Sequence, residues 1–328
     1  GFAWQIHHRH RDIEYFLKID AIYIPGPNDL WWEDDPYFPV VPAKPVWLHD
    51  LVEDTLGPSY SYGFKDIQHV LLRNGQVSPT NLERVTGLPR CDGIYLNDPQ
   101  AMDVDLGHIS EMVDLHYITI EETPVTDGDL KILAPLRRLK RISLYSVPIS
   151  GSGFVHLQEL DNLQQIEVVD TNISDDALRH LSTLTNLQYV RLTRTLVTDA
   201  GFEHLATLTK LQGINLSGTD VTDDGVQHLA ALDKLRVVIL VDTQVTGEAL
   251  RHLSELSNLE KLDLEYTQVT DDGFRYLRAP TKLKHLYLDG TKITDGALLQ
   301  ICNFSELESV SLADTQVTDA GLADLDAL

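Results

Sequence analysis

Histidine is the residue whose spacing first suggests chemistry in this sequence. His156, His180, His204, His228 and His252 recur every 24 residues, and imidazole is a common ligand of zinc. A zinc ion needs its nitrogen ligands at ~2.1 Å. If each histidine lies on its own short helix, the axes of neighbouring helices are about 8–10 Å apart. The histidine row therefore predicts repeated packing or hydrogen bonding rather than a metal site.

Paired carboxylates are the second candidate, notably Glu121 with Glu122 and Asp263 with Glu265. Residues that lie two positions apart on a strand share a face of the sheet, as a general acid and its partner base must. Such a pair also needs a closed, water-poor pocket, which an open sheet does not supply, so we expect a solvated acidic face. The G-x-x-x-x-G-K, H-E-x-x-H, G-x-S-x-G and dinucleotide glycine patterns do not occur. The sequence predicts no enzyme, no catalytic residue and no cofactor.

Charge and cysteine content restrict the partners. The 328 residues carry a formal charge of -24, which disfavours nucleic acid and anionic lipid as partners of the main body of the chain. Cys91 and Cys302 fit no metal-ligand spacing and form no disulfide framework. A protein partner is the class that composition leaves most open.

The elements that must position these residues follow from an internal repeat. Variants of Val-Thr-Asp begin a unit every 24 residues, so ten full units cover residues 77–316 and a half unit follows to Leu328. A period of this length indicates a solenoid. The units begin at Val77, Ala101, Val125, Ile149, Ile173, Val197, Val221, Val245, Val269, Ile293 and Val317.

Each unit combines two periodicities. Leucines recur every three residues from Leu250 to Leu259, as on the buried stripe of a short helix, whereas Leu262 and Leu264 alternate as in a strand. Thr270 or Asp271 stands where a helix-capping oxygen is needed. Strands that recur in one direction after each helix stack as a parallel sheet. Because helices are wider than the strand spacing, we expect the sheet to be concave.

These residues resemble the leucine-rich repeats. Residues 259–269 match the strand signature of that family, with Thr267 where many members carry Asn or Cys, and the Val-Thr-Asp-x-Gly-Leu opening is similar to a bacterial, planctomycete-type class. The resemblance implies a right-handed α/β horseshoe that binds partners. We interpret the repeated threonines as hydroxyls that satisfy backbone groups of the turns, with Pro99 and Val147 breaking the row. The row is Thr123, Thr171, Thr195, Thr219, Thr243, Thr267, Thr291 and Thr315.

The first 76 residues differ in composition and hold all four tryptophans. Residues 1–45 predict a juxtamembrane-like helix and a Pro-rich acidic connector, because an aromatic and then basic start is typical of the exit from a membrane helix; a solvated helix start is the alternative. Residues 46–76 predict a cap helix at 46–56 and a degenerate first strand near Ile67–Val77, and the repeats fill 77–328. We expect a possible membrane anchor upstream of Gly1; the localisation is otherwise open.

The concave surface is the predicted binding site, formed by unit positions 17, 19, 21 and 22. Tyrosine and arginine, which carry much of the energy of interfaces, gather there, and one strand adds three apolar side chains that we expect to be exposed. We predict a non-enzymatic protein-binding scaffold. The alternatives are a recruiting part of a larger enzyme or adaptor and a carbohydrate or small-ligand binder. The predicted residues are Tyr95, Tyr117, Arg141, Tyr145, Tyr189, Arg191, Arg194, Val237, Ile239, Val241, Tyr266 and Tyr287.

Overall fold

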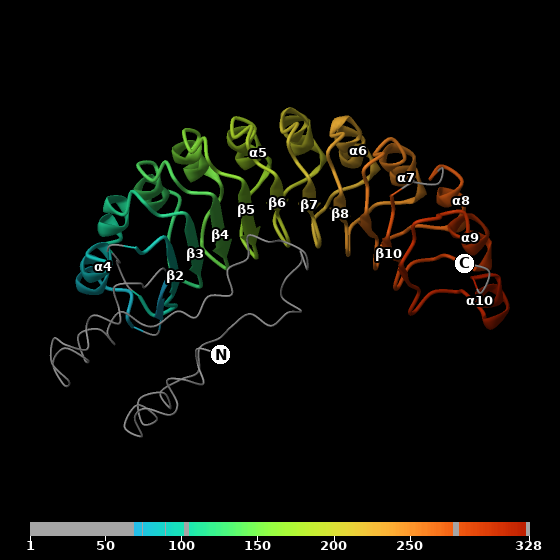
Figure 1. Ribbon diagram of the computed structural model, residues 1–328, viewed down its shortest axis with the longest axis horizontal. Helices are drawn as coiled ribbons and strands as arrows, with labels where there is room; N and C mark the ends of the chain where they lie inside the picture. The colour runs from blue at the N-terminus through green and yellow to red at the C-terminus, as the bar shows by residue number, and fades with distance from the viewer. Residues whose placement is uncertain (1–68, 74, 89, 102–104, 278–281, 326–328) are drawn as a thin grey trace, which may run out of the picture.

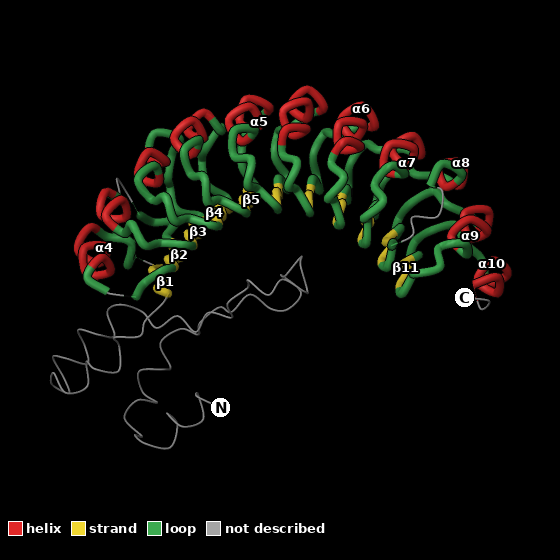
Figure 2. The backbone as a smooth tube through the Cα atoms, turned by 45° about the horizontal axis from the view of Figure 1, so that its top comes forward, coloured by secondary structure: helices red, strands yellow, loops and turns green. Residues whose placement is uncertain are grey.

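The protein is an open arc with strands along its inner side and helices along its outer side (Figures 1 and 2). The computed structural model describes residues 69–73, 75–88, 90–101, 105–277 and 282–325. Within them the predicted α/β solenoid is confirmed. The predicted segment 1–45 and the predicted cap helix at 46–56 lie outside the described residues.

One parallel sheet forms the inner layer, and its eleven strands lie in sequence order. Each residue pairs with the residue 24 positions later, as Ile142 pairs with Ile166, so equivalent positions of all units lie in rows across the sheet. The strands are β1 (His69–Arg73), β2 (Gly93–Asn97), β3 (Tyr117–Glu121), β4 (Arg141–Tyr145), β5 (Gln165–Val169), β6 (Tyr189–Arg191), β7 (Gly213–Asn215), β8 (Val237–Ile239), β9 (Lys261–Asp263), β10 (His285–Tyr287) and β11 (Ser309–Ser311).

The degenerate first strand is present as β1. Val70 and Leu72 are buried and pair in register with Ile94 and Leu96 of β2. The leucine signature of the later units therefore extends one period before Val77.

The outer layer mixes α-helices with 3-10 helices, where the repeat pattern led us to expect one kind of short helix. A three-residue leucine period matches the three residues per turn of a 3-10 helix as well as it matches the stripe of an α-helix. The α-helices are α4 (Pro79–Thr86), α5 (Asp175–Leu181), α6 (Asp223–Val226), α7 (Gly247–Leu253), α8 (Asp271–Phe274), α9 (Asp295–Ile301) and α10 (Asp319–Leu325). The 3-10 helices are η3 (Gly107–Glu111), η4 (Asp129–Leu133), η5 (Ser152–Leu157), η6 (Asp199–Thr207) and η7 (Gln227–Ala231).

A continuous apolar core fills the space between the two layers. Leu262 of β9 and Leu264 just after it are fully buried, as are Phe154 and Phe202 from the helical side. Strand alternation therefore sends positions 18 and 20 into the core and leaves positions 17, 19 and 21 to the concave face.

Aspartate and threonine connect successive units where the helices begin. Asp223 accepts hydrogen bonds from the backbone N–H of Thr246 at 2.8 Å and from its hydroxyl at 2.6 Å, across 23 residues. The Thr246 hydroxyl also caps its own helix by accepting from Glu248 N–H. Thr198, Thr222 and Thr294 cap their helices in the same way, but the predicted cap Thr270 makes no side-chain cap hydrogen bond. Asp271 binds Thr294 of the next unit instead of capping its own helix.

The predicted structural role holds for most of the threonine row. Thr123 donates to Glu121 O, whereas the buried Thr171 hydroxyl has no hydrogen-bond partner among the described residues. The hydroxyls of Thr195, Thr219, Thr243, Thr267, Thr291 and Thr315 each donate to the carbonyl three residues earlier. Where Pro99 breaks the row, the buried Asp98 carboxylate accepts from Gly75 and Val77 N–H and so satisfies a turn of the preceding unit.

Position 22 of nine successive units forms a row along the edge where the strands end, here called the rim row. All nine residues have positive φ, an αL conformation that costs most residues about 1 kcal/mol or more. Their N–H groups extend the ladder, as Arg194 donates to Ser217 O and Tyr266 to Asp289 O, and this fixes the conformation. The rim row is Glu122, Ser146, Asp170, Arg194, Gly218, Asp242, Tyr266, Gly290 and Asp314.

Among the described residues, no helix has the length and apolar character needed to cross a membrane. The anchor predicted upstream of Gly1 stays a prediction.

Candidate functional site on the concave face

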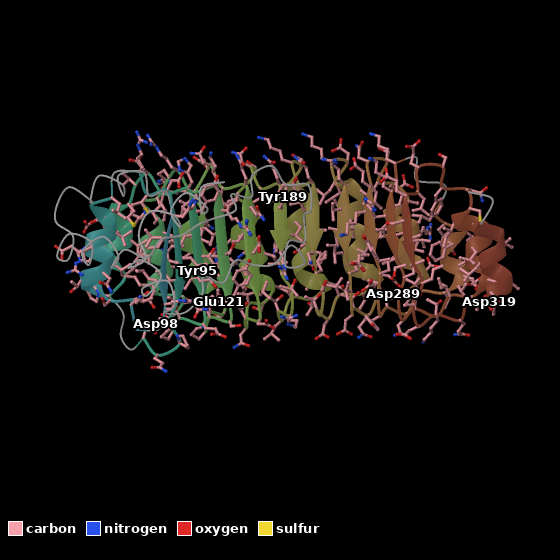
Figure 3. The ribbon with its side chains drawn as sticks, turned by 60° about the horizontal axis from the view of Figure 1, so that its bottom comes forward. Tyr95, Asp98, Glu121, Tyr189, Asp289 and Asp319 are labelled. Carbon is pink, nitrogen blue, oxygen red and sulfur yellow. The ribbon has the colours of Figure 1, made fainter. Side chains whose placement is uncertain are left out.

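The predicted tyrosines and arginines all lie on the concave strands or the rim row. Figure 3 marks two of them, Tyr95 and Tyr189, on different strands of the inner face. Tyr266, with 54% of its surface exposed, and Arg194 are exposed rim residues. The other members are half-buried: Tyr95, Tyr117, Arg141, Tyr145, Tyr189, Arg191 and Tyr287. They extend from β2 to β10, so the structure does not gather them into one patch.

Three of them do meet, around a carboxylate that sequence reasoning missed. Glu167 on β5 is only 3% exposed. Arg141 Nη2 lies 2.5 Å from Glu167 Oε1, and Arg191 Nη1 lies 4.0 Å from Oε2. The Tyr145 hydroxyl donates to Oε2, and the Gln165 amide donates to Oε1 at 2.7 Å. We call these five residues the Glu167 network.

Electrostatics in the Glu167 network follow from this burial. Burial, together with the nearby Glu167 charge, raises the pKa of Tyr145 above its usual range. Burial lowers the pKa of Arg191, and the Glu167 carboxylate opposes that effect. Two guanidinium groups therefore stabilise one buried carboxylate. Their contacts with Glu167 hold the concave face together, so these hydrogen bonds are not available to a partner. The sequence held a signal for this network. Arg191 lies one 24-residue repeat after Glu167, and Arg141 lies two residues before the position one repeat earlier, so both fall on strands next to that of Glu167.

The prediction of an exposed apolar cluster on β8 is wrong. Ile239 has no exposed surface, while Val237 and Val241 are half-buried. Ile239 does point to the concave side, since Val238 and Leu240 on either side are core residues and Ile239 is not. It is covered nonetheless. Placing a charge at Ile239 would bury that charge beside Asp263 rather than test a binding surface.

Ile239 is buried for a reason that applies throughout the middle of the arc. Side chains from neighbouring strands converge on the inside of a curved sheet, so the central outward position of each strand is shielded by its neighbours. In the units from 125 to 268, position 19 holds five buried residues, Ser143, Glu167, Asn215, Ile239 and Asp263, and the half-buried Arg191. In these units positions 17, 19 and 21 are buried or half-buried, and the exposed residues of the concave face belong to the rim row.

An acidic region occupies the C-terminal part of the face and consists of Asp263, Glu265 and Asp289. Burial raises the pKa of Asp263 to about 7, and the charges of Glu265 and Asp289 add to this effect. Lys261 opposes it, and its Nζ lies 5.0 Å from the centre of the Tyr287 ring. The expectation of a fully solvated acidic face is thus wrong at Asp263, which is 7% exposed. Glu121 and Glu122 lie on β3 and the rim row, and only Glu122 is exposed.

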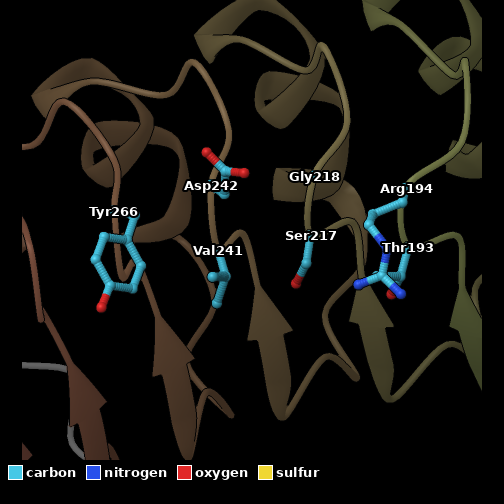
Figure 4. Close-up of a pocket in the computed structure, with 7 residues that line it drawn as sticks. All are labelled: Thr193, Arg194, Ser217, Gly218, Val241, Asp242 and Tyr266. Carbon is cyan, nitrogen blue, oxygen red and sulfur yellow. The ribbon is translucent and has the colours of Figure 1, made fainter.

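An open hollow of about 460 Å³ lies where the strands meet the rim row. Figure 4 shows Arg194 and Tyr266 at its two ends, with Val241 and Asp242 between them. Sequence reasoning selected Arg194, Val241 and Tyr266 but missed the polar residues beside them. The lining residues are Thr193, Arg194, Ser217, Gly218, Val241, Asp242 and Tyr266.

Histidine and cysteine form no ligand cluster in the described part of the chain. No three side chains of His, Cys, Asp or Glu there are arranged to hold a metal ion. His180 instead contacts the Gln158 amide at 2.9 Å. Cys91 is buried, and burial raises the pKa of its thiol to about 12, so the Cys91 thiol stays protonated at neutral pH.

Comparisons with known proteins agree with this geometry. The family model described as Leucine Rich repeat matches residues 207–230 and 255–277. An internalin of Listeria monocytogenes is 21% identical, with a TM-score of 0.61 over 76% of this chain and 75% of its own. A leucine-rich-repeat protein of Leptospira interrogans is 16% identical, with a TM-score of 0.60 over 82% and 72%. The chain therefore has the leucine-rich-repeat fold.

A mammalian structure shares the fold as well. The mouse RP105/MD-1 complex contains a chain that is 15% identical, with a TM-score of 0.62 over 80% of this chain and 49% of its own. At these identities the likeness concerns the fold. No curated protein resembles the sequence closely enough to count as a match.

Proposed function

We propose that the protein is a non-enzymatic scaffold that binds a protein partner on its concave face. The observation that carries the proposal is the inner surface itself, where eleven strands in register present their outward side chains on one continuous curve. Tyrosine and arginine are abundant there, and both are enriched among residues that carry binding energy. The mouse RP105/MD-1 complex, which contains a chain similar in fold, is an assembly of two proteins.

The shape of the surface supports binding over catalysis. The buried carboxylate of Glu167 is already satisfied by two arginines and a tyrosine. Asp263 keeps its proton to about neutral pH, but it accepts from the Glu265 N–H and lies on an open sheet. General acid–base chemistry needs a positioned group and an enclosed substrate. An extended curved sheet is better suited to a large partner.

A pair of matched substitutions tests the proposal. Val237 is half-buried on the concave face, and Val155 is 45% exposed on η5 of the convex side. In affinity capture from a lysate of the source organism, Val237→Glu should weaken capture of the principal partner at least tenfold, because the added charge is desolvated on binding. Val155→Glu should leave capture unchanged. Equal capture by both variants, with unchanged circular dichroism, would contradict a concave site.

A further inference from the structure

The hollow at the rim row differs from the rest of the concave face because its floor lacks large side chains. Gly218 has φ +66, and a side chain there would lie 2.8 Å from Arg194 Cγ. Ser217 beside it is buried and directs its hydroxyl to Asn215. A volume of about 460 Å³ is within the range that holds a small ligand or a long side chain. An outside group can therefore enter the rim row at this hollow.

The charge available in the hollow is negative. Arg194 is engaged by the neighbouring rim residue Asp170 in a two-pronged ion pair, with Nη2 at 2.6 Å from Oδ2, and this pairing raises the pKa of Arg194. Asp242 is exposed, and within the described residues its carboxylate has no hydrogen bond or ion pair. The cation of the hollow is thus compensated and its anion is not.

The remaining walls suit an aliphatic stem that ends in a cation. Val241 gives the floor an apolar surface, and the Tyr266 ring closes one end. Lysine and arginine lay their methylene groups on apolar surface and place their charge on carboxylates or aromatic faces. The chain already makes one such contact nearby, where Lys261 Nζ lies over the Tyr287 ring.

We propose that the hollow receives a lysine or arginine side chain of the protein partner, with the methylene groups over Gly218 and Val241 and the charged end at Asp242. This inference rests on the proposed function and adds the chemistry of the partner. The acidic region formed by Asp263, Glu265 and Asp289 lies on the next strands and favours the same basic partner. An anionic partner segment would have to displace Asp170 from Arg194.

Selection of peptides tests the proposal without knowledge of the natural partner. A display library of random peptides is selected on the full chain, and the affinities of the recovered peptides are measured by fluorescence anisotropy. We expect the strongest binders to contain lysine or arginine. Their affinity should fall about tenfold with Asp242→Asn, because the variant loses one charge-assisted contact. Asp220→Asn is the matched control, since Asp220 is exposed and lies two residues beyond Gly218 on the chain.

The other outcomes separate the two proposals. Binders that lose affinity with Val237→Glu but not with Asp242→Asn overturn the basic-side-chain site and leave concave-face binding intact. Acidic binders that depend on Arg194 also overturn the site, since the hollow would then recognise an anion. Binders that respond only to Val155→Glu, or the absence of any binder sensitive to a concave substitution, overturn both proposals.

Discussion

Glu167 and Asp263 occupy the same position of two units four repeats apart, and both carboxylates are buried on the concave face. Glu167 has two guanidinium groups and a tyrosine hydroxyl around it. Asp263 lies between Ile239 and Tyr287 in the row, accepts one backbone hydrogen bond and is near two further carboxylates. One backbone position thus gives a compensated charge in β5 and an uncompensated one in β9.

The difference teaches that the scaffold decides burial and the neighbouring units decide charge. In the middle of the arc, curvature leaves position 19 buried or half-buried. Whether the buried group then keeps a charge depends on the inward side chains of the same and adjacent strands. Arg141 supplies a cation to Glu167, whereas the equivalent neighbours of Asp263 include Val237 and Asp289.

Removing the compensated charge should have the largest effect. Glu167→Gln leaves Arg141 and Arg191 partly buried without their shared carboxylate. Breaking a buried ion pair on one side costs about 3–5 kcal/mol, and we expect this loss in the free energy of unfolding from urea titration.

Asp170→Asn is the control for that prediction, because the pair of Asp170 with Arg194 is 40–59% exposed. Exposed pairs contribute about 0–1 kcal/mol. Similar losses in both variants would mean that Glu167 is no better shielded than a surface carboxylate.

The uncompensated charge should appear as a pH dependence. Native Asp263 keeps its proton to about pH 7, whereas the unfolded chain releases it near the ordinary value of 3.8. The contribution of Asp263 to the free energy of unfolding is therefore fully present below about pH 4 and is lost as the pH rises to 7. A shift of this size corresponds to on the order of 2–4 kcal/mol.

Asp263→Asn should remove this loss, so the variant gains stability relative to the parent chain between pH 4 and 7 and keeps that gain at pH 8. Chemical denaturation of both proteins at several pH values measures the difference, in which the other titrating groups cancel. A constant difference across that range would show that Asp263 titrates normally.

The smallest effect concerns the scaffold that both regions share. Asp223→Ala removes the acceptor of Thr246 N–H, the Thr246 hydroxyl and Ala249 N–H. We expect a loss of about 1–3 kcal/mol, because part-buried donors are left unpaired. The neighbouring Asp224 is exposed, so Asp224→Ala should change the midpoint of thermal unfolding little. Equal shifts would show that the link between units does not depend on the Asp223 carboxylate.

The sequence predicted most of the fold and less of the site. The 24-residue period, the parallel strands, the buried leucines and the turn-forming threonines follow from local pattern, and each is present. The Glu167 network was missed because its members were considered one strand at a time. The apolar cluster at Ile239 was wrong because alternation gives the side of the sheet and not the exposure on that side.

What the sequence alone determined is therefore the identity of each position: which side chains enter the core, which face inward on the arc, and which cap or link the units. These properties depend on neighbours within a few residues or at one fixed period. The tertiary structure decided how closely the inward side chains approach one another. That distance depends on the curvature accumulated over many units, and it determines which carboxylates are buried, which arginines are already paired and where the hollow beside Asp242 lies open.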